Sequence, residues 1–316
     1  MTVSETTTPT STSPSTPAPR WNVGENRRPA DGLHPHSQEA ERSESSQRSQ
    51  RSQEPAPRLR ADAVSLAYGE RIVVDGVTLD VPTGRITVVV GPNGCGKSTL
   101  LRGLGRLLKP RGGSVLLDGE AITSLPTREV ARRLGLLPQQ PIVPEGVSVL
   151  ELVERGRHPH HGLFRSWGRA DEEAVASALT RTDLVELASV PVDSLSGGQR
   201  QRVWLAMVLA QDTPVLLLDE PTSFLDIAHQ LDVLDLVRSL RDQSGTTVVM
   251  VLHDLAMAAR YADHLVAMSD GRIIAEGPPA QVVTPEVIAD VFGVTASVIV
   301  DPESGTPLVI PRRRAS

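Results

Sequence analysis

The chain has 316 residues and a formal net charge of −6, with 39% hydrophobic and 22% charged residues. This balance fits one folded α/β domain with flanking segments and argues against a nucleic-acid partner, because nucleic-acid-binding domains normally carry a basic face. The single cysteine, Cys95, excludes an intramolecular disulfide and a cysteine-based zinc site, so a reducing, cytosolic compartment is expected. No apolar run approaches the roughly 20 residues of a membrane-spanning helix, and no signal-peptide pattern is present.

Residues 1 to 57 are expected to form a disordered tail. Ser, Thr, Pro, Gln and Arg dominate this segment. Its large apolar residues up to position 56 are Met1, Val3, Trp21, Val23 and Leu33. Such a segment cannot bury enough apolar surface to offset the entropy lost on ordering.

Order is predicted to begin near Leu59. Strand patterns cover Leu59–Tyr68 and Ile72–Val81, the second with a turn signal at Asp75–Gly76. A short β-branched run, Arg85–Val90, precedes a helical pattern over Lys97–Leu108.

The second half alternates in the same way. Ser148–Ala188 is mainly helical, with a polar loop at Arg157–Gly168. Val215–Leu218 and Thr246–Leu252 are continuous apolar runs on either side of a helical stretch, Ile227–Leu240. Buried strands that alternate with helices predict a mostly parallel sheet covered on both faces.

A phosphate-binding pattern, G-x-x-x-x-G-K-[ST], lies between the strand and the helix. The matching residues are Gly91, Pro92, Asn93, Gly94, Cys95, Gly96, Lys97, Ser98 and Thr99. Glycines let backbone N–H groups converge on a phosphate, and the helix presents its positive end to the same charge. Lys97 is expected to reach the β- and γ-phosphates and Ser98 to ligate Mg²⁺. Cys95 could be a redox switch, but without a pairing cysteine it is expected only to fill a variable position.

Two adjacent carboxylates end the apolar strand at Val215–Leu218. Asp219 is expected to hold the Mg²⁺ shell, and Glu220 is placed to act as general base toward an attacking water. Solvated acids at a strand end are the alternative, which the phosphate loop upstream makes the weaker interpretation.

A glycine-rich pentapeptide decides the family. Its residues are Leu195, Ser196, Gly197, Gly198 and Gln199. With these motifs in this order, the chain from about Leu59 to Val294 resembles the ABC ATPases, whose signature is this pentapeptide.

The resemblance implies further roles. Tyr68 looks like the aromatic residue that stacks on adenine, and Gln139 like the glutamine that joins the Mg²⁺ and water shell to a helical subdomain. Asp226, in Phe224–Asp226, looks like the D-loop aspartate, and His253 like the switch histidine beside the γ-phosphate.

The family also implies an architecture and an assembly. A P-loop NTPase-type sheet is expected with an antiparallel β subdomain and an inserted helical subdomain at about 140–212, all within 58–294, followed by a C-terminal extension, 295–316. Ser196–Gly198 would form a second anion cradle. A head-to-tail dimer would then enclose ATP and Mg²⁺ between the phosphate loop of one copy and the signature of the other.

Within the family, the chain is most similar to import ATPases for ferric siderophores, haem and cobalamin. The supporting stretches are Glu151–His160, Phe224–Gln230, Leu252–Ala262 and Gly277–Glu286. Iron-siderophore import through a separate integral-membrane permease, supplied by a substrate-binding protein, is the first hypothesis, with a peripheral position on the cytoplasmic face of the membrane. Cobalamin, haem or other metal import, an export ATPase and a non-transport ABC ATPase remain alternatives.

Three histidines, His158, His160 and His161, could suggest a metal site. Their spacing lacks a carboxylate or cysteine partner, so a solvated loop is expected instead.

Overall fold

The computed structural model of the protein describes residues 56–139, 145–161, 167–223 and 225–314. The fold below is that of the unit Pro55–Ser316. The predicted tail, residues 1 to 57, lies outside the described residues except for Ala56 and Pro57.

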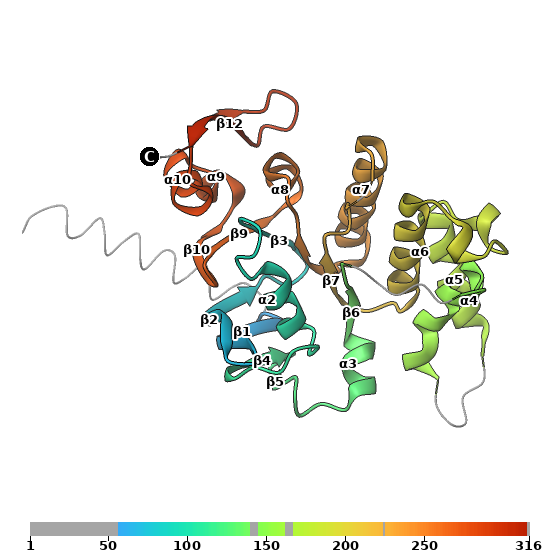
Figure 1. The fold of residues 1–316 in the computed structure, drawn as a ribbon. Coiled ribbons are helices and arrows are strands. Elements are labelled where there is room, and N and C mark those ends of the chain that lie inside the picture. Colours follow the sequence, from blue (N-terminus) through green and yellow to red (C-terminus); the bar gives the residue numbers. More distant parts are fainter. Residues whose placement is uncertain (1–55, 140–144, 162–166, 224, 315–316) are drawn as a thin grey trace, which may run out of the picture. The chain divides into compact units, whose positions relative to one another are not determined.

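A six-stranded sheet forms the centre of this unit, in the order β10-β9-β3-β8-β7-β6 (Figure 1). Its strands are β3 (Ile86–Val90), β6 (Leu134–Leu137), β7 (Val215–Asp219), β8 (Thr247–Val251), β9 (His264–Ser269) and β10 (Arg272–Gly277). All neighbouring pairs are parallel except β9 with β10. The predicted mostly parallel sheet is confirmed, and β3, β7 and β8 are buried along their whole length, as their continuous apolar runs indicate.

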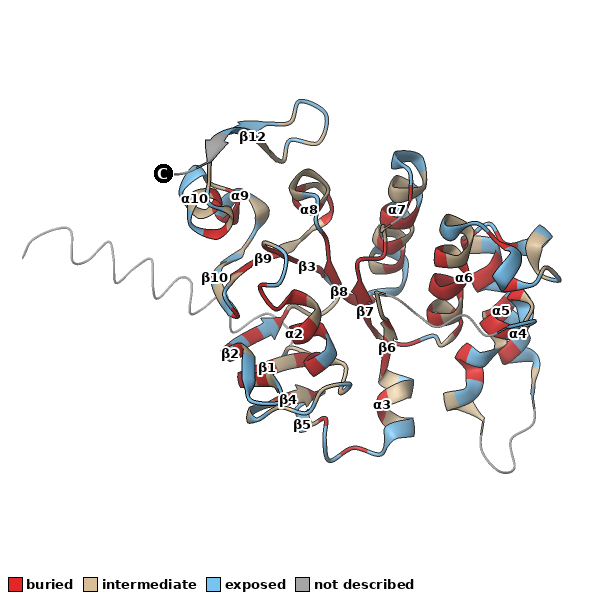
Figure 2. Cartoon of the chain, viewed as in Figure 1, coloured by how far each residue is buried: buried red, intermediate tan, exposed pale blue. Residues whose placement is uncertain are grey.

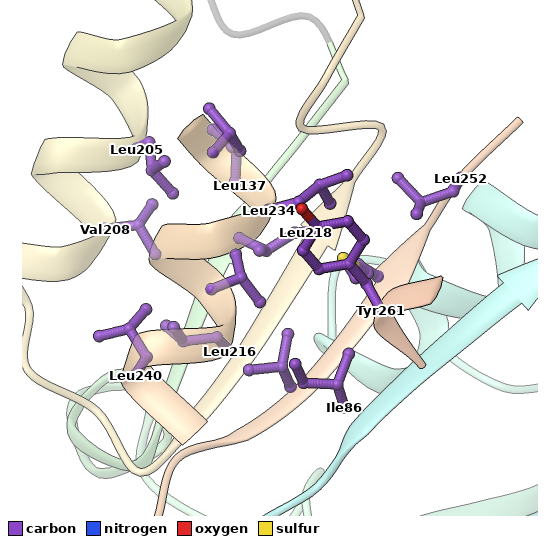
Figure 3. Close-up of a cluster of buried hydrophobic side chains, with 14 of the residues drawn as sticks. Ile86, Leu137, Leu205, Val208, Leu216, Leu218, Leu234, Leu240, Leu252 and Tyr261 are labelled. Atoms are coloured by element: carbon purple, nitrogen blue, oxygen red, sulfur yellow. The ribbon is translucent and has the colours of Figure 1, made fainter. Parts of the chain in front are cut away.

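Helices cover both faces of the central sheet. They include α2 (Lys97–Leu104), α6 (Gly197–Ala210), α7 (Ile227–Ser244) and α8 (Leu255–Tyr261). Because side chains alternate along a strand, Leu216 and Leu218 of β7 join a cluster with α6, α7 and α8, whereas Leu217 joins a second cluster with α2. Figure 3 shows Leu216 and Leu218 against α7, and Figure 2 shows burial concentrated along the strands and the inner helix faces.

A four-stranded antiparallel sheet packs against the second cluster. Its order is β2-β1-β4-β5, with β1 (Leu59–Tyr68), β2 (Arg71–Val81), β4 (Gly112–Leu117) and β5 (Glu120–Ala121). The turn predicted at Asp75–Gly76 is wrong, because β2 continues through these residues. The chain instead reverses at Gly69–Glu70, and the pairing register of β1 with β2 shifts beside Gly76. A glycine signal therefore marks a bulge here rather than a reversal.

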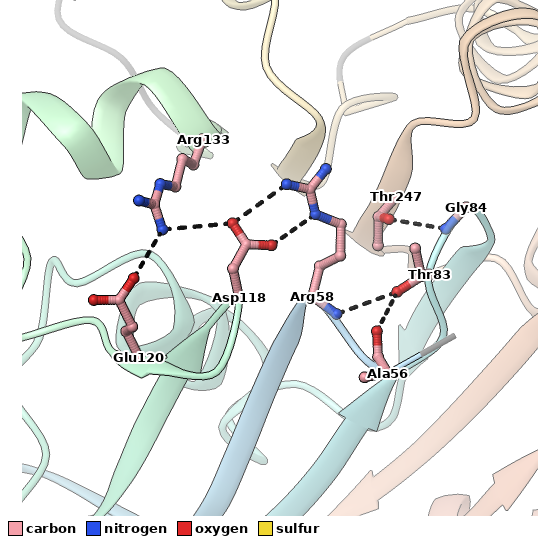
Figure 4. A network of polar contacts seen from close by, with 8 residues as sticks. All are labelled: Ala56, Arg58, Thr83, Gly84, Asp118, Glu120, Arg133 and Thr247. Atoms are coloured by element: carbon pink, nitrogen blue, oxygen red, sulfur yellow. Dashed lines mark hydrogen bonds and ion pairs between the residues drawn. The ribbon is translucent and has the colours of Figure 1, made fainter. Parts of the chain in front are cut away.

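Polar contacts connect this sheet to its surroundings (Figure 4). Arg58 Nε lies 2.7 Å from Asp118 Oδ1, and Arg133, the last residue of α3 (Thr127–Arg133), lies 3.6 Å from Asp118 Oδ2. The Gly84 N–H donates to the Thr247 hydroxyl of β8 at 2.9 Å. The segment that leads into β3 is thus anchored to the central sheet at its start.

The inserted helical part contains α4 (Val149–Glu154), the 3₁₀ helix η1 (Arg155–His160), α5 (Arg169–Arg181), the 3₁₀ helices η2 (Val185–Leu187) and η3 (Val192–Ser194), and α6. The prediction of a polar loop over Arg157–Gly168 is wrong for its first residues, which belong to η1. Arg157 is buried within η1, where its guanidinium pairs with Asp171 at 2.9 Å and donates to the Ala210 carbonyl at 2.8 Å. A charged residue in a polar stretch of sequence indicates a solvated loop. It can nevertheless be buried when an ion pair and hydrogen bonds satisfy its N–H donors.

The helix predicted over Lys97–Leu108 ends earlier, at Leu104. Gly105 follows, and Arg106 has a left-handed backbone with a φ of 62°. A left-handed residue cannot continue a right-handed helix, so the chain turns away toward β4.

The C-terminal residues form α9 (Pro279–Val282), α10 (Pro285–Phe292) and a hairpin of β11 (Val294–Val300) and β12 (Pro307–Arg314). Ala296 is buried in the first cluster, and Glu303 pairs with Arg260 of α8 at 3.1 Å. The hairpin therefore packs on the helices of the domain, beyond the boundary expected after Val294. Among the helices of the described ranges, none combines the length and apolarity needed to cross a bilayer.

Candidate nucleotide-binding site

The predicted phosphate loop connects β3 to α2. Gly91 has a φ of 153°, and a Cβ on it would lie 2.2 Å from the Met268 carbonyl oxygen of β9. A residue with a side chain would push the loop off the sheet, so this position requires glycine. The loop then turns until Lys97 begins the helix, which directs free N–H groups of the first turn at the space in front of the loop.

A cavity of about 330 Å³ opens in front of this loop. Its lining residues come from five separate parts of the sequence. They are Val73, Asn93, Gly94, Gly96, Lys97, Ser98, Thr99, Gln139, Glu220 and His253. The structure therefore brings together the predicted phosphate loop, Gln139, Glu220 and His253, in a volume within the range of small-ligand sites.

Lys97 is buried, and its ammonium donates to the carbonyls of Gly91 at 2.9 Å and Pro92 at 3.0 Å. These two bonds hold the positive charge at the loop. An ammonium has three donors, so it can add an anionic oxygen to these partners.

Ser98 lines the cavity, and its hydroxyl donates at 2.8 Å to Oδ1 of Asp219, which is not part of the lining. Burial raises the pKa of Asp219, and the neighbouring charge of Glu220 adds to this, while the Ser98 bond opposes it. A buried carboxylate beside a hydroxyl is a set of hard oxygen donors and fits Mg²⁺. Within the described part of the chain, no group of three or more His, Cys, Asp or Glu side chains is placed to hold a metal ion.

Glu220 follows directly and has three side-chain partners. Its Oε1 lies 2.6 Å from His253 Nε2, and its Oε2 accepts from the Ser223 hydroxyl at 3.0 Å. Burial would raise the pKa of Glu220, but hydrogen bonds from Gln139, Ser223 and His253 together lower it. The carboxylate is therefore held in its charged, proton-accepting form at the cavity wall.

Two contributors were not predicted from the sequence. Val73 of β2 lines the cavity, and Ser223 binds Glu220. The spacing of Ser223, three residues after Glu220, could have suggested such a bond. Nothing in the sequence marks Val73, because its position depends on the packing of β2 against the loop.

The remaining predicted residues lie outside the cavity lining. Tyr68, at the end of β1, is 46% exposed, and its hydroxyl accepts from Arg102 at 3.1 Å. Cys95 is buried, and its thiol pKa is raised by that burial despite the charge of Lys97. Asp226 caps α7 and accepts from the His229 N–H at 3.0 Å. Phe224, beside it, lies outside the described residues.

The signature residues are likewise separate from the cavity. Ser196 caps α6 in a reciprocal arrangement. Its Oγ accepts from the Gln199 N–H at 3.2 Å, and its own N–H donates to Gln199 Oε1 at 3.0 Å. Ser196 and Gly197 are exposed, and Gly198 follows in the first turn. The start of α6 is therefore not part of the cavity in front of α2.

Two of the three predicted histidines, His160 and His161, contact other elements, and His158 is exposed. His160 Nε2 lies 2.7 Å from the Gln211 carbonyl oxygen, and His161 lies 3.4 Å from Asp171, with its ring tilted by 44° against that of Trp167. These contacts tie η1 to α5 and α6.

Comparison with known proteins places this site in a family. A profile described as ABC transporter matches residues 74–223. The probable siderophore transport system ATP-binding protein YusV of Bacillus subtilis (strain 168) is 54% identical over 256 residues, covering 81% of this chain and 93% of that relative. The chain belongs to the ABC transporter family.

Further matches agree with this assignment. The ferric enterobactin transport ATP-binding protein FepC of Escherichia coli (strain K12) is 51% identical, covering 83% of this chain and 97% of that protein. An inward-facing structure of a putative metal-chelate type ABC transporter aligns with a TM-score of 0.70 at 28% identity, over 82% of this chain and 98% of the matched chain. The resemblance found in the sequence is confirmed, and the chain is an ATP-binding ABC-type ATPase with the P-loop NTPase fold.

Proposed function

We propose that this ABC ATPase powers the import of an iron–siderophore complex through a separate membrane permease. The observation that carries the mechanism is the single cavity that unites the phosphate loop with Gln139, Glu220 and His253. The cargo is inferred from two relatives, whose names refer to siderophore and ferric enterobactin transport. These names favour iron–siderophore import over cobalamin or haem import, export, or a non-transport role.

The triphosphate of ATP would lie along the loop. Lys97 and the N–H groups of Gly94 to Thr99 would bind its β- and γ-phosphates, with the positive end of α2 behind them. Tyr68 would stack on the adenine from the end of β1.

Ser98 and Asp219 would hold Mg²⁺, with Gln139 contributing to the same shell. When bound, Mg²⁺ neutralises charge that develops on the phosphate oxygens. The pair fits this ion because a hydroxyl and a carboxylate, both hard oxygen donors, lie 2.8 Å apart beside the cavity that Ser98 lines.

Glu220 would take a proton from the attacking water as the water oxygen bonds to the γ-phosphorus and ADP leaves with the bridging oxygen. His253, 2.6 Å from Glu220, would orient that carboxylate and contact the γ-phosphate. Gln139 would report the occupancy of the site to the helical subdomain.

A second copy of the chain would complete each site. The signature residues Ser196 and Gly197 and the D-loop residue Asp226 are exposed on this chain, Gly198 and Gln199 are partly buried, and all five lie outside its own cavity lining. A head-to-tail dimer would place them over the partner's ATP, and loss of the γ-phosphate would let the dimer open.

The permease would dock beside Gln139, at about residues 139 to 164, where Val147 and η1 lie. Pro141, Ile142 and Val143 of this region lie outside the described residues. The subunit would then sit peripherally at the cytoplasmic face of the membrane, with 58–294 as its nucleotide-binding domain and about 140–212 as its helical subdomain.

Reconstitution tests this proposal. The chain, assembled with its permease in liposomes that enclose ATP and Mg²⁺ on the ATPase side, should accumulate radiolabelled ferric siderophore in the presence of a siderophore-binding protein. Cobalamin and haem serve as competing cargoes in the same assay. Uptake of one of these instead, with none of the ferric siderophore, would refute the cargo while leaving the ATPase assignment intact.

A further inference from the structure

The turn between β9 and β10, residues Ser269 to Gly271, touches the phosphate loop through its backbone. The Gly271 N–H donates to the Cys95 carbonyl at 2.9 Å. The Gly271 carbonyl accepts from the Asp75 N–H of β2 at 3.0 Å. One residue, distant in sequence from both, therefore bonds to the loop on one side and to the antiparallel sheet on the other.

No side chain can occupy this junction without moving it. Gly271 has a φ of 76°, and a Cβ on it would lie 2.3 Å from the Val73 carbonyl oxygen and 3.3 Å from the Val74 Cα. These are backbone atoms of a paired strand, so they cannot rotate away as a flexible side chain could.

Two residues that contact Gly271, Val73 and Cys95, lie at the nucleotide cavity. Val73 lines the cavity directly, and Cys95 lies between the lining residues Gly94 and Gly96. Met268, just before the turn, supports the start of the loop at Gly91. The end of β9 and the turn after it therefore form a backbone platform under the loop, although Gly271 is not itself part of the cavity lining.

We infer that Gly271 is a positioning residue for ATP binding, which sets the distance between the phosphate loop and Val73. This inference rests on the proposed nucleotide site. Displacing the turn would change the distance between Cys95 and Val73. Shifts on the order of 1 Å among the groups that position a substrate can lower activity by up to about 100-fold.

Gly293 provides a matched control. It also has a left-handed backbone, with a φ of 64°, but nothing lies within 4 Å of a Cβ built on it. It ends α10 rather than touching the loop. Alanine strains the backbone at either position, whereas asparagine tolerates the left-handed region and retains the Cβ. Asparagine therefore separates backbone strain from the clash with Val73.

The experiment measures the Kd for ATP and the thermal midpoint of the full chain carrying Gly271→Ala, Gly271→Asn, Gly293→Ala or Gly293→Asn. Both Gly271 variants should bind ATP at least about tenfold more weakly than wild type, and both Gly293 variants within about twofold of it. Wild-type affinity in Gly271→Asn, or an equal loss of affinity at both positions, overturns the inference. Failure of the wild-type chain to bind ATP would instead refute the proposed site.

Hydrogen exchange on the wild-type chain keeps the inference testable if the Gly271 variants do not fold. A non-hydrolysable ATP analogue with Mg²⁺ should slow amide exchange in a peptide that covers 269–276, because ordering the loop stabilises the Gly271 bonds. A peptide that covers 285–293 should exchange unchanged. Equal exchange of residues 269–276 with and without the bound analogue would contradict the positioning role.

Discussion

Glu220 lies in a left-handed backbone conformation, with a φ of 53°, directly after the buried strand β7. Such a conformation is unfavourable for a residue with a side chain, by about 1 to 3 kcal/mol, and it persists only where the surroundings hold it. Here the bonds to Ser223 and His253 hold it. The left-handed backbone at Glu220 places its carboxylate at the cavity wall, where it could accept a proton from an attacking water.

The general-base role predicts the behaviour of Glu220→Gln. An amide cannot accept the water proton, so turnover should fall by about 100-fold or more, while ATP affinity is retained. Steady-state phosphate release and ATP binding measure the two effects, and size-exclusion chromatography with ATP should reveal a trapped dimer. Glu173→Gln, on the exposed face of α5, serves as control and should hydrolyse normally. Near wild-type turnover in Glu220→Gln would show that another group takes the proton.

The buried pair of Arg157 and Asp171 matters for stability rather than chemistry. Both residues are at most 5% exposed. Asp171→Asn leaves the guanidinium without its anion, and breaking a buried pair in this way costs about 3 to 5 kcal/mol. Chemical denaturation measures the loss. A change as small as that of the exposed Glu173→Gln would mean that the pair contributes little.

The same pair predicts a pH dependence. Burial would raise the pKa of Asp171, but hydrogen bonds from Arg157 and the Gly168 N–H, with the charge of Arg157, lower it below the unfolded value. The contribution of a carboxyl with a lowered folded pKa is present above its unfolded pKa of about 4 and is lost as the pH falls through the folded pKa. Wild type should therefore lose stability more steeply than Asp171→Asn below about pH 4. Parallel curves for the two proteins would contradict the lowered pKa.

At the scale of elements, α2 and α6 have similar N-terminal turns but lie in different surroundings. Each begins in a glycine-containing turn with free N–H groups, and only α2 faces the cavity of its own chain. Ser196 satisfies its own cap with Gln199, so the start of α6 is stable without a ligand. A preformed cradle at the surface suits recognition of a phosphate held by another copy.

Ser196→Arg tests this arrangement. The bulky cation should abolish hydrolysis, while ATP still binds to the phosphate loop of the same chain. Mixing Ser196→Arg with Lys97→Ala chains gives dimers with one doubly defective site and one intact site, so partial activity should return. Unchanged hydrolysis in Ser196→Arg alone, or no recovery in the mixture when mixed dimers are shown to form, would rule out a site shared between copies.

At the scale of the whole molecule, the strand order decides which motifs meet. β8 lies between β3 and β7, so the carboxyl ends of these three strands are neighbours. The phosphate loop follows β3, Glu220 follows β7 and His253 follows β8. Crevices beyond the carboxyl ends of a parallel sheet are where such folds bind ligands.

The N-terminal segment is predicted to be dispensable for the ATPase domain. Its low apolar content argues that deleting residues 1–56 leaves the thermal midpoint and the basal ATPase rate nearly unchanged. Differential scanning calorimetry and phosphate release check both quantities on the shortened and full chains. A clear drop in either would show that the segment contributes contacts that its composition does not reveal.

The sequence by itself determined the family, the mostly parallel sheet and the motif residues, because the loop pattern, the apolar runs and the signature are each contiguous. The sequence alone identifies Lys97, Ser98, Asp219, Glu220 and His253 as candidate site residues. Local patterns failed where a residue's surroundings come from elsewhere in the chain.

Only the tertiary structure decided which of those residues share a cavity and what supports them. Arg157 reads as part of a polar loop, yet it is buried against Asp171. Nothing in the sequence connects Val73 of β2 or Gly271 of the β9–β10 turn to the phosphate loop, yet both lie beside it. The physical reason is that burial, close backbone approach and strand order arise from long-range packing, which no short stretch of sequence encodes.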